Sequence, residues 1–172
     1  LRELAKKLAI VHQQNTIPFD VTVEKLVGYG RVPYENLCIP SKRDDDEDKI
    51  NWAMSVTGVY DIKEELLSQL SGGQRQRAWI AMSLAQDTDT LLLDEPTTFL
   101  DIKHQIEVLK LIESLNKEHG ISIIMVLHDM NQAMRYSTEV IALKAGKSIA
   151  QGAPESVINE ALLKELYGVD LD

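Results

Sequence analysis

The spacing of apolar residues predicts a helical segment in the middle of the chain. Between residues 20 and 86, apolar positions recur at helical intervals and predict helices over Val21–Tyr29, Asp45–Thr57, Asp61–Leu67 and Gln74–Gln86. Ahead of this segment, the end of a polar helix leads into a short strand, Leu8–Val11. The first half of the sequence therefore reads as one strand followed by a lobe of helices.

After residue 86 the pattern changes to continuous apolar runs. Thr90–Leu93 and Ile121–Leu127 are such runs, which are typical of strands buried on both faces. An amphipathic helix is expected between them over Asp101–His119, ahead of Gly120, a residue that favours a helix C-terminus. Its apolar stripe comprises Ile102, Ile106, Leu109 and Ile112. A strand, a helix and a second strand predict a parallel βαβ unit.

The C-terminal part predicts small elements. Glu139–Lys144 and Ser148–Gln151 form a hairpin pattern around Ala145–Lys147, and two short helices follow, one from Pro154 and one over Asn159–Tyr167. The whole pattern predicts an α/β fold. Its core comprises residues 1–19 and 87–172, and a helical subdomain comprises residues 20–86.

The length, the net charge and the cysteine count of the chain exclude several classes of protein. The 172 residues suit one domain with an inserted lobe, and the net charge of −9 argues against nucleic acid as a partner. A single cysteine, Cys38, excludes an intrachain disulfide, fits a reducing compartment and is expected to be inert. Ile121–Leu127 is much shorter than the ~20 residues of a membrane span. The first residue, Leu1, is not Met, and no signal peptide follows it, so we expect a fragment or a processed product.

The run Leu70–Arg77, Leu-Ser-Gly-Gly-Gln-Arg-Gln-Arg, is the strongest local signal. Its two glycines let a ligand approach the backbone, and the helix that starts beside them offers unpaired N–H groups to an anion. The alternative is a structural helix start, because Ser71 and Gln74 have the spacing of a capping box. Both interpretations can hold at one helix end.

An acidic pair, Asp94 and Glu95, ends the first apolar run. The carboxyl end of a parallel strand is where α/β sheets bind ligands, so Asp94 suits Mg²⁺ and Glu95 suits activation of a water. The alternative is an acidic turn that caps the next helix. His128 ends the second run, and adjacent strands would place it on the same sheet edge as Glu95. A structural hydrogen-bonding role for His128 remains the alternative.

Taken together, these segments resemble the ATP-binding-cassette (ABC) ATPases. Leu70–Arg77 is similar to their signature motif, Leu91–Glu95 to the Walker B strand and Leu100-Asp101 to the D-loop. His128 is similar to the switch histidine, and Gln13 to the Q-loop glutamine, with Gln14 as the alternative. Residues 22–34, 96–101 and 146–155 resemble the branch that imports ferric siderophores, haem and cobalamin.

The resemblance implies a P-loop NTPase-like core and an ATPase that uses ATP and Mg²⁺. Asp94 and Gln13 would hold the metal, Glu95 would be the general base, and His128 would contact the γ-phosphate. Asp101 would couple the two sites of a homodimer. The residues that would bind the γ-phosphate of ATP held by the opposite subunit are Ser71, Gly72, Gly73 and Gln74.

The resemblance also implies the partners of such a subunit. The helical subdomain would meet transmembrane permease subunits at the cytoplasmic face of the cell membrane, and an extracytoplasmic substrate-binding protein would act indirectly. No nucleic acid is expected. A translation-associated or DNA-repair ATPase of the same superfamily is the alternative, which the short insertion and the acidic charge disfavour.

One family motif is absent from the sequence. The phosphate loop, G-x-x-x-x-G-K-[ST], occurs nowhere in the 172 residues; Gly146-Lys147-Ser148 fails the pattern because its first position is Ile141. We therefore expect a truncated sheet without the Walker A strand, no ATPase activity of this chain alone, and self-association through exposed strand edges. The acidic run 44–48 lacks the spacing of a Ca²⁺ loop and predicts a solvated helix start.

Overall fold

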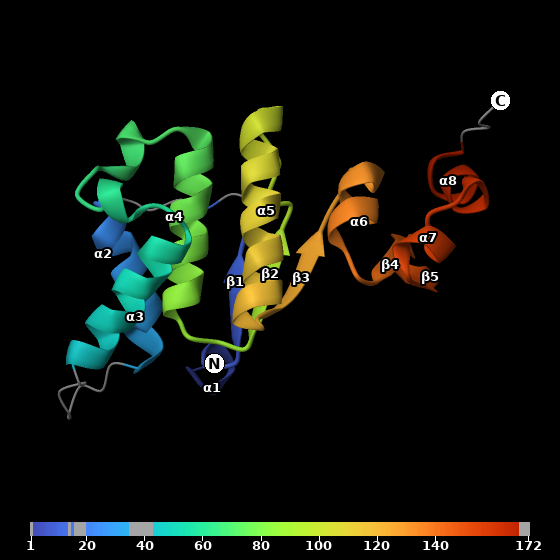
Figure 1. The fold of residues 1–172 in the computed structure, drawn as a ribbon. Coiled ribbons are helices and arrows are strands. Elements are labelled where there is room, and N and C mark those ends of the chain that lie inside the picture. Colours follow the sequence, from blue (N-terminus) through green and yellow to red (C-terminus); the bar gives the residue numbers. More distant parts are fainter. Residues whose placement is uncertain (1, 14, 16–19, 35–42, 169–172) are drawn as a thin grey trace. The chain divides into compact units, whose positions relative to one another are not determined.

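The computed structural model describes residues 2–13, 15, 20–34 and 43–168, with the side chains of residues 43 and 44 excepted (Figure 1). Cys38 and Gln14 lie outside the described residues. The chain divides into two compact units, Leu1–Val126 and Leu127–Asp172. Among the described residues, no helix combines the length and the hydrophobicity that a membrane span requires.

The first unit contains three strands and five α-helices among its described residues. The strands are β1 (Leu8–Val11), β2 (Thr90–Asp94) and β3 (Ser122–Val126). The helices are α1 (Arg2–Ala5), α2 (Val23–Gly28), α3 (Arg43–Val56), α4 (Gly72–Ala85) and α5 (Ile102–His119). Short 3₁₀ helices cover Tyr29–Tyr34, Tyr60–Ile62 and Leu67–Gln69.

The three strands form one parallel sheet in the order β1-β2-β3. Leu8 pairs with Thr90 at one end of the register, and Thr90 pairs with Ser122. The predicted parallel βαβ unit is thus confirmed, with α5 as its crossover helix, and the α/β fold class is confirmed with it. β2 occupies the middle of the sheet, with β1 and β3 as its neighbours on either side.

Only one face of this sheet is buried. Ala9, Val11, Leu91 and Leu93 point into the core, whereas Ile10, Ile124 and Val126 are 39%, 57% and 45% exposed. The prediction that Ile121–Leu127 is a buried strand is wrong for this reason. Successive side chains of a strand point to opposite faces of the sheet. The helices α4 and α5, which contact β1 and β3, cover one of these faces, so the side chains on the other face are exposed.

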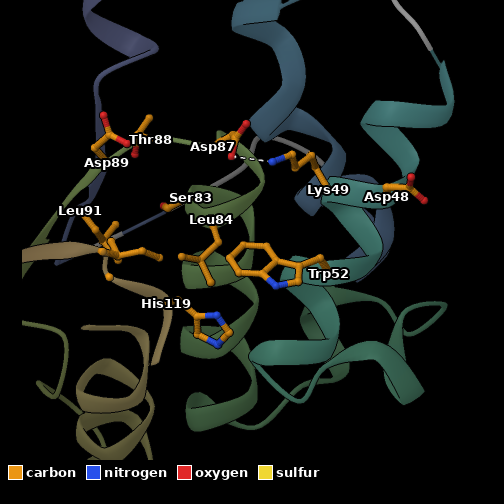
Figure 2. Close-up of a pocket in the computed structure, with 12 residues that line it drawn as sticks. Asp48, Lys49, Trp52, Ser83, Leu84, Asp87, Thr88, Asp89, Leu91 and His119 are labelled. Carbon is orange, nitrogen blue, oxygen red and sulfur yellow. Dashed lines mark hydrogen bonds and ion pairs between the residues drawn. The ribbon is translucent and has the colours of Figure 1, made fainter. Parts of the chain in front are cut away.

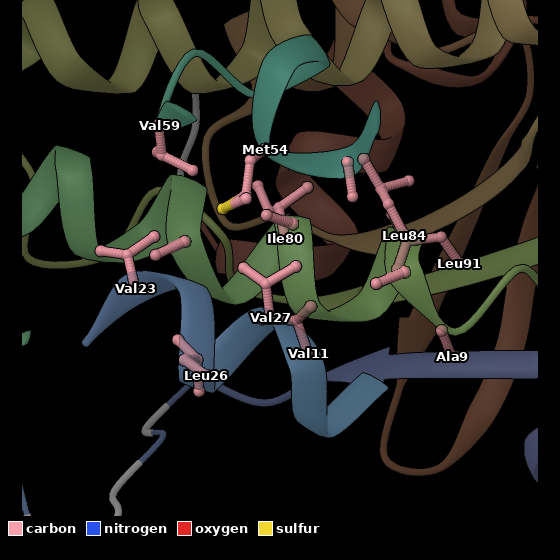
Figure 3. Close-up of a cluster of buried hydrophobic side chains, with 14 of the residues drawn as sticks. Ala9, Val11, Val23, Leu26, Val27, Met54, Val59, Ile80, Leu84 and Leu91 are labelled. Atoms are coloured by element: carbon pink, nitrogen blue, oxygen red, sulfur yellow. The ribbon is translucent and has the colours of Figure 1, made fainter. Parts of the chain in front are cut away.

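The helical lobe and the strands share one hydrophobic core (Figure 3). Side chains from α2, α3 and α4 meet those of β1 and β2 in this cluster. Its labelled members are Ala9, Val11, Val23, Leu26, Val27, Met54, Val59, Ile80, Leu84 and Leu91. Burial of each large aliphatic side chain contributes about 1.5–3 kcal/mol, so the lobe and the sheet stabilise each other.

Two predictions about helices in this unit are wrong. Asp61–Leu67 is not an α-helix, because the backbone N–H of Val23 donates to the carbonyl of Glu65, and that of Leu67 donates to Val21. Strand-like pairing with residues 21–23 thus competes with helical hydrogen bonds. In α5, Ile102 and Ile106 are 75% and 42% exposed. The buried stripe is instead Val108, Leu109, Ile112 and Leu115.

A buried ion pair ties the lobe together. The Nε of Arg31 lies 2.7 Å from Oδ1 of Asp46 on α3. The Nη1 of the same arginine donates to the carbonyl of Ala85 on α4 at 2.9 Å. Both side chains are largely buried. Asp46 belongs to the acidic run that the sequence predicts to be solvated, and that prediction is wrong for Asp46 because Arg31 draws it inward.

The second unit is small and has a core of its own. It comprises α6 (Met130–Tyr136), β4 (Val140–Lys144), β5 (Lys147–Gly152), α7 (Pro154–Val157) and α8 (Glu160–Tyr167). The predicted hairpin and the two terminal helices are confirmed, and Gly146-Lys147-Ser148 lies in that hairpin. The sequence pattern does not predict α6, whose first turn is capped by Asp129. The buried cluster contains Ala142, Val157 and Leu162.

Candidate functional site

The predicted Q-loop glutamine and the predicted general base lie in contact. Gln13 follows β1 by two residues, and Glu95 directly follows β2. The two strands are parallel neighbours, so both loops leave the sheet at the same edge. The side-chain amide of Gln13 donates from Nε2 to Oε2 of Glu95 at 2.6 Å, across 82 residues of sequence. The fold thus joins two positions that the sequence keeps far apart.

The carboxylate of Glu95 is held by a second donor. The hydroxyl of Thr98 donates to the same oxygen, Oε2, at 2.9 Å. Glu95 also has a left-handed backbone, with φ of +49°, which is uncommon outside glycine and occurs often at functional sites. The sequence does not single out Thr98, because its role depends on the tight turn that returns to Glu95.

Asp94 is the last residue of β2 and is only half-buried. In the described part of the chain, no three His, Cys, Asp or Glu side chains gather in a way that could hold a metal ion. Asp94 and the amide oxygen of Gln13 are the two protein ligands predicted for a metal at this edge of the sheet. This partial set fits Mg²⁺, which usually takes one or two protein ligands and completes its shell with water and phosphate oxygens.

The predicted capping box at the start of α4 is present. The hydroxyl of Ser71 accepts from the backbone N–H of Gln74 at 3.3 Å, and Oε1 of Gln74 accepts from the backbone N–H of Ser71 at 2.9 Å. The backbone N–H groups of Gly72 and Gly73 have no acceptor inside the helix, as at any helix start. The structural interpretation is therefore confirmed, and binding of an anion at the same end stays a prediction.

Asp101 caps α5. Its Oδ1 accepts from the backbone N–H of His104 at 2.9 Å, and the Nδ1 of His104 lies 2.8 Å from each carboxylate oxygen. Hydrogen bonds from the backbone and then from the ring of His104 lower the pKa of Asp101. The sequence does not single out His104, because it reads as one polar residue on a helix that needs no further explanation.

The starts of α4 and α5 touch each other. A Cβ atom added to Gly73 would lie 2.5 Å from Cδ2 of His104, and one added to Gly72 would lie 3.2 Å from Cδ2 of Leu100. Figure 1 shows α4 and α5 side by side. The predicted signature segment and the predicted D-loop of one subunit therefore form a continuous packed surface.

His128 belongs to the second unit, where it follows β3 by two residues. A position of His128 close to Glu95, which belongs to the first unit, stays a prediction. Val126, the last residue of β3, pairs with Asp94 in the sheet register.

A cavity of about 470 Å³ lies at the opposite edge of the sheet, where β2 and β3 begin (Figure 2). Lys49 of α3 lies 2.9 Å from Asp87 across it, and the rings of Trp52 and His119 meet edge to face with centroids 5.5 Å apart. None of the predicted site residues lines this cavity. It separates α3 from the amino ends of the strands and does not belong to the predicted site.

Comparisons with known proteins agree with the motifs. Residues 1–98 match the family model described as ABC transporter. The ferric enterobactin transport ATP-binding protein FepC of Escherichia coli (strain K12) is 47% identical over 168 residues, which cover 98% of the chain and 62% of FepC. The petrobactin import ATP-binding protein FpuC of Bacillus anthracis is 47% identical over 170 residues, covering 99% of the chain and 62% of FpuC.

Solved structures share the fold. A metal-chelate type ABC transporter in an inward-facing conformation aligns with a TM-score of 0.88 at 25% identity, over 95% of this chain and 64% of its own. The dimeric ATP-binding cassette MJ0796 bound to ADP and Pi aligns with a TM-score of 0.71 at 28% identity, over 89% of this chain and 65% of its own. The chain spans about three-fifths of the length of the curated relatives it matches.

Proposed function

The chain belongs to the ABC transporter family, and from this premise we propose that it is part of the ATP-hydrolysing subunit of an importer for iron-siderophore compounds. The names of the relatives support this substrate class, because they transport ferric enterobactin and petrobactin. The hydrogen bond between Gln13 and Glu95 is the observation that carries the proposal of hydrolysis.

In this proposal Glu95 takes a proton from the attacking water. Its carboxylate is oriented by donors from Gln13 and Thr98, so a water bound beside it would face a fixed acceptor. The nitrogen of the Gln13 amide donates to Glu95, which leaves the amide oxygen to face a metal ion or a water. Gln13 would thus connect the base with the metal.

Asp94 and Gln13 are the residues that would hold Mg²⁺. When bound with ATP, Mg²⁺ neutralises charge on the phosphate oxygens. The position of Asp94 at the end of β2 supports this role, and Glu95 beside it would accept the proton of the water. His128 would contact the γ-phosphate from the loop after β3.

The other proposed contacts require a second subunit. Ser71, Gly72, Gly73 and Gln74 would bind the γ-phosphate of ATP held by the partner subunit, with the backbone of α4 as the donor. Asp101 would couple the two sites of the homodimer. The dimeric form of MJ0796 supports this arrangement.

We further propose how the subunit is placed in the cell. The helical subdomain, residues 20–86, would bind transmembrane permease subunits on the cytoplasmic face of the membrane, and the core would comprise residues 1–19 and 87–172. An extracytoplasmic binding protein would deliver the iron compound to the permease.

Permease-bound ATPase activity that rises when the loaded binding protein is added would support this placement, and an unchanged rate would argue against it.

The test of hydrolysis uses Glu95→Gln in a longer form of this protein that includes a phosphate loop. We expect ATP turnover to fall at least about 100-fold, because the general base is lost, while ATP binding is retained. Glu118→Gln, on an exposed turn of α5, is the matched control and should leave turnover unchanged. The 172-residue chain alone should be inactive. Turnover by this chain, or a wild-type rate in Glu95→Gln, would contradict the proposal.

A further inference from the structure

We propose that His104 is a positioning residue that fixes Asp101 against the signature segment, residues 71–74, so that both move as one body. This inference rests on the proposed function, in which Asp101 and the signature segment serve the two ATP sites of a dimer. His104 itself would touch neither ATP nor the attacking water.

The first support is the way His104 holds Asp101. Its backbone N–H and its ring Nδ1 both lie within hydrogen-bond distance of the Asp101 carboxylate, at 2.9 and 2.8 Å. Donation from Nδ1 requires the tautomer protonated on that nitrogen or the protonated ring. Asp101 is exposed, so without these bonds its side chain would rotate freely in water.

The second support is the packing of the same ring on Gly73. The imidazole lies so close to Gly73 that a Cβ atom there would fall 2.5 Å from Cδ2 and 2.8 Å from Cγ. Only glycine allows this approach. A shift of the start of α4 must therefore displace the ring, and the ring carries the hydrogen bond to Asp101.

Neighbouring contacts reinforce the same junction. The side-chain amide of Gln105 donates to the carbonyl of Leu100 at 2.9 Å, which fixes the residue before Asp101. One turn further along both helices, Nη1 of Arg77 lies 3.3 Å from Oε2 of Glu107. The two helices are thus joined over successive turns, and His104 contacts a residue of each predicted motif, Asp101 and Gly73.

Three substitutions separate the hydrogen bond from the packing. In the longer protein with a phosphate loop, His104→Phe keeps an aromatic ring on Gly73 and removes only the ring donor to Asp101, since the backbone N–H of residue 104 remains in every variant. His104→Asn removes the ring but places a side-chain N–H where Nδ1 stood. His104→Ala removes both. We expect kcat to fall about 10-fold in His104→Phe and further in His104→Ala, with the Kd for ATP unchanged, because a 1 Å misplacement can cost up to about 100-fold.

His104→Asn decides between positioning and simple stability. We expect its kcat to lie between those of wild type and His104→Ala, because its amide restores a side-chain donor to Asp101 while the ring contact with Gly73 is lost. A wild-type kcat in His104→Phe would overturn the inference, as would equal losses of kcat in His104→Phe and His104→Asn that follow their melting temperatures. A wild-type longer protein that hydrolyses no ATP would instead overturn the proposed function.

A measurement on the 172-residue chain tests the contact without ATP. ¹⁵N NMR of the imidazole should show Nδ1 protonated and hydrogen-bonded at neutral pH, and Asp101→Ala should abolish that signature. The tautomer protonated on Nε2 in the wild-type chain would overturn the inference whatever the ATPase result.

Discussion

At the scale of single residues, Gly30 lies directly against the backbone of α4. A Cβ atom at this position would lie 2.2 Å from the carbonyl oxygen of Met82 and 3.1 Å from the backbone nitrogen of Gln86. Backbone atoms of a packed helix cannot move aside as a flexible side chain can. Gly30 therefore allows the 3₁₀ helix Tyr29–Tyr34 to pack directly on α4.

We predict that Gly30→Ala lowers the free energy of unfolding by about 1–3 kcal/mol, through overpacking. Gly28→Ala is the matched control, because its Cβ would meet only Ile50, at 3.9 Å. The control should be neutral or stabilising by about 0.5 kcal/mol, since alanine suits a helix better than glycine does. Urea unfolding followed by the fluorescence of Trp52 and Trp79 measures both variants. Equal effects of the two substitutions would contradict the packing argument.

Asp101 predicts a pH dependence of stability. Its pKa in the folded chain is lowered from 3.8 by the hydrogen bonds from His104, so the folded state favours the carboxylate. The stabilisation is complete above about pH 4 and is lost as the pH falls through the lowered value. In Asp101→Asn, which retains a side chain suited to helix capping, this loss should be absent. The stability difference between wild type and variant should therefore shrink from pH 6 to pH 2.5. A constant difference would contradict the shift.

Local patterns predicted some site contacts and missed others. The capping box of Ser71 and Gln74 follows from residues three positions apart, and the structure has it as predicted. The bond between Gln13 and Glu95 depends on the register of β1 on β2, which local patterns do not encode. The family resemblance named both residues. Thr98 and His104 were missed because their roles depend on a tight turn and on the packing of two helices.

At the scale of elements, the pair Arg31–Asp46 fixes α3 against the rest of the lobe. We predict that Arg31→Met lowers the free energy of unfolding by about 3 kcal/mol, because it leaves a buried carboxylate unpaired. Lys117→Met is the control. It breaks an exposed pair with Glu113 on α5 and should cost about 0.5 kcal/mol or less.

The double variant Arg31→Met with Asp46→Asn separates charge from packing. It should recover part of the loss, because the amide costs less to bury than an unpaired charge. Thermal and urea unfolding would report all three variants. A double variant that is less stable than Arg31→Met would show that the loss of stability comes mainly from the lost packing of the arginine and not from the unpaired buried carboxylate.

The positions of helices and strands with strong hydrophobic patterns were predictable, whereas the face of each element that is buried was harder to predict. The apolar runs identified β2 and β3, but hydrophobicity alone did not show that Ile124 and Val126 face outward. For α5 the pattern predicted the helix correctly but assigned Ile102 and Ile106 to its buried face, and both side chains are exposed. Over Asp61–Leu67, backbone hydrogen bonds to residues 21–23 take the place of the predicted helix, and no local sequence pattern indicates this pairing.

At the scale of the whole molecule, the two units differ in how much core they possess. The first has a cluster that joins its sheet with its helices, while the buried cluster of the second contains Ala142, Val157 and Leu162, with Pro154 buried beside them on α7. Local stability follows the buried apolar contacts of a region. The boundary at Val126 also differs from the sequence-based division into core and lobe, which stays a prediction.

We therefore predict that the second unit opens at a lower free energy than the first. Native-state hydrogen exchange should show amides of β4 and β5 exchanging at least about 10-fold faster than those of β2. Amide protection in β1 provides an internal reference within the first unit. Equal protection in the two hairpin strands and in β2 would contradict this order of stability.

The bond between Gln13 and Glu95 has a consequence for how the chain is made. A ribosome adds about 5–20 residues per second, so the 82 residues between these partners take roughly 4–16 s to synthesise. During that interval β1 has already been synthesised, but β2, its strand neighbour among the described residues, does not yet exist. The lobe is translated in full before the two strands can pair, and the strand that is synthesised first waits longest for its partner.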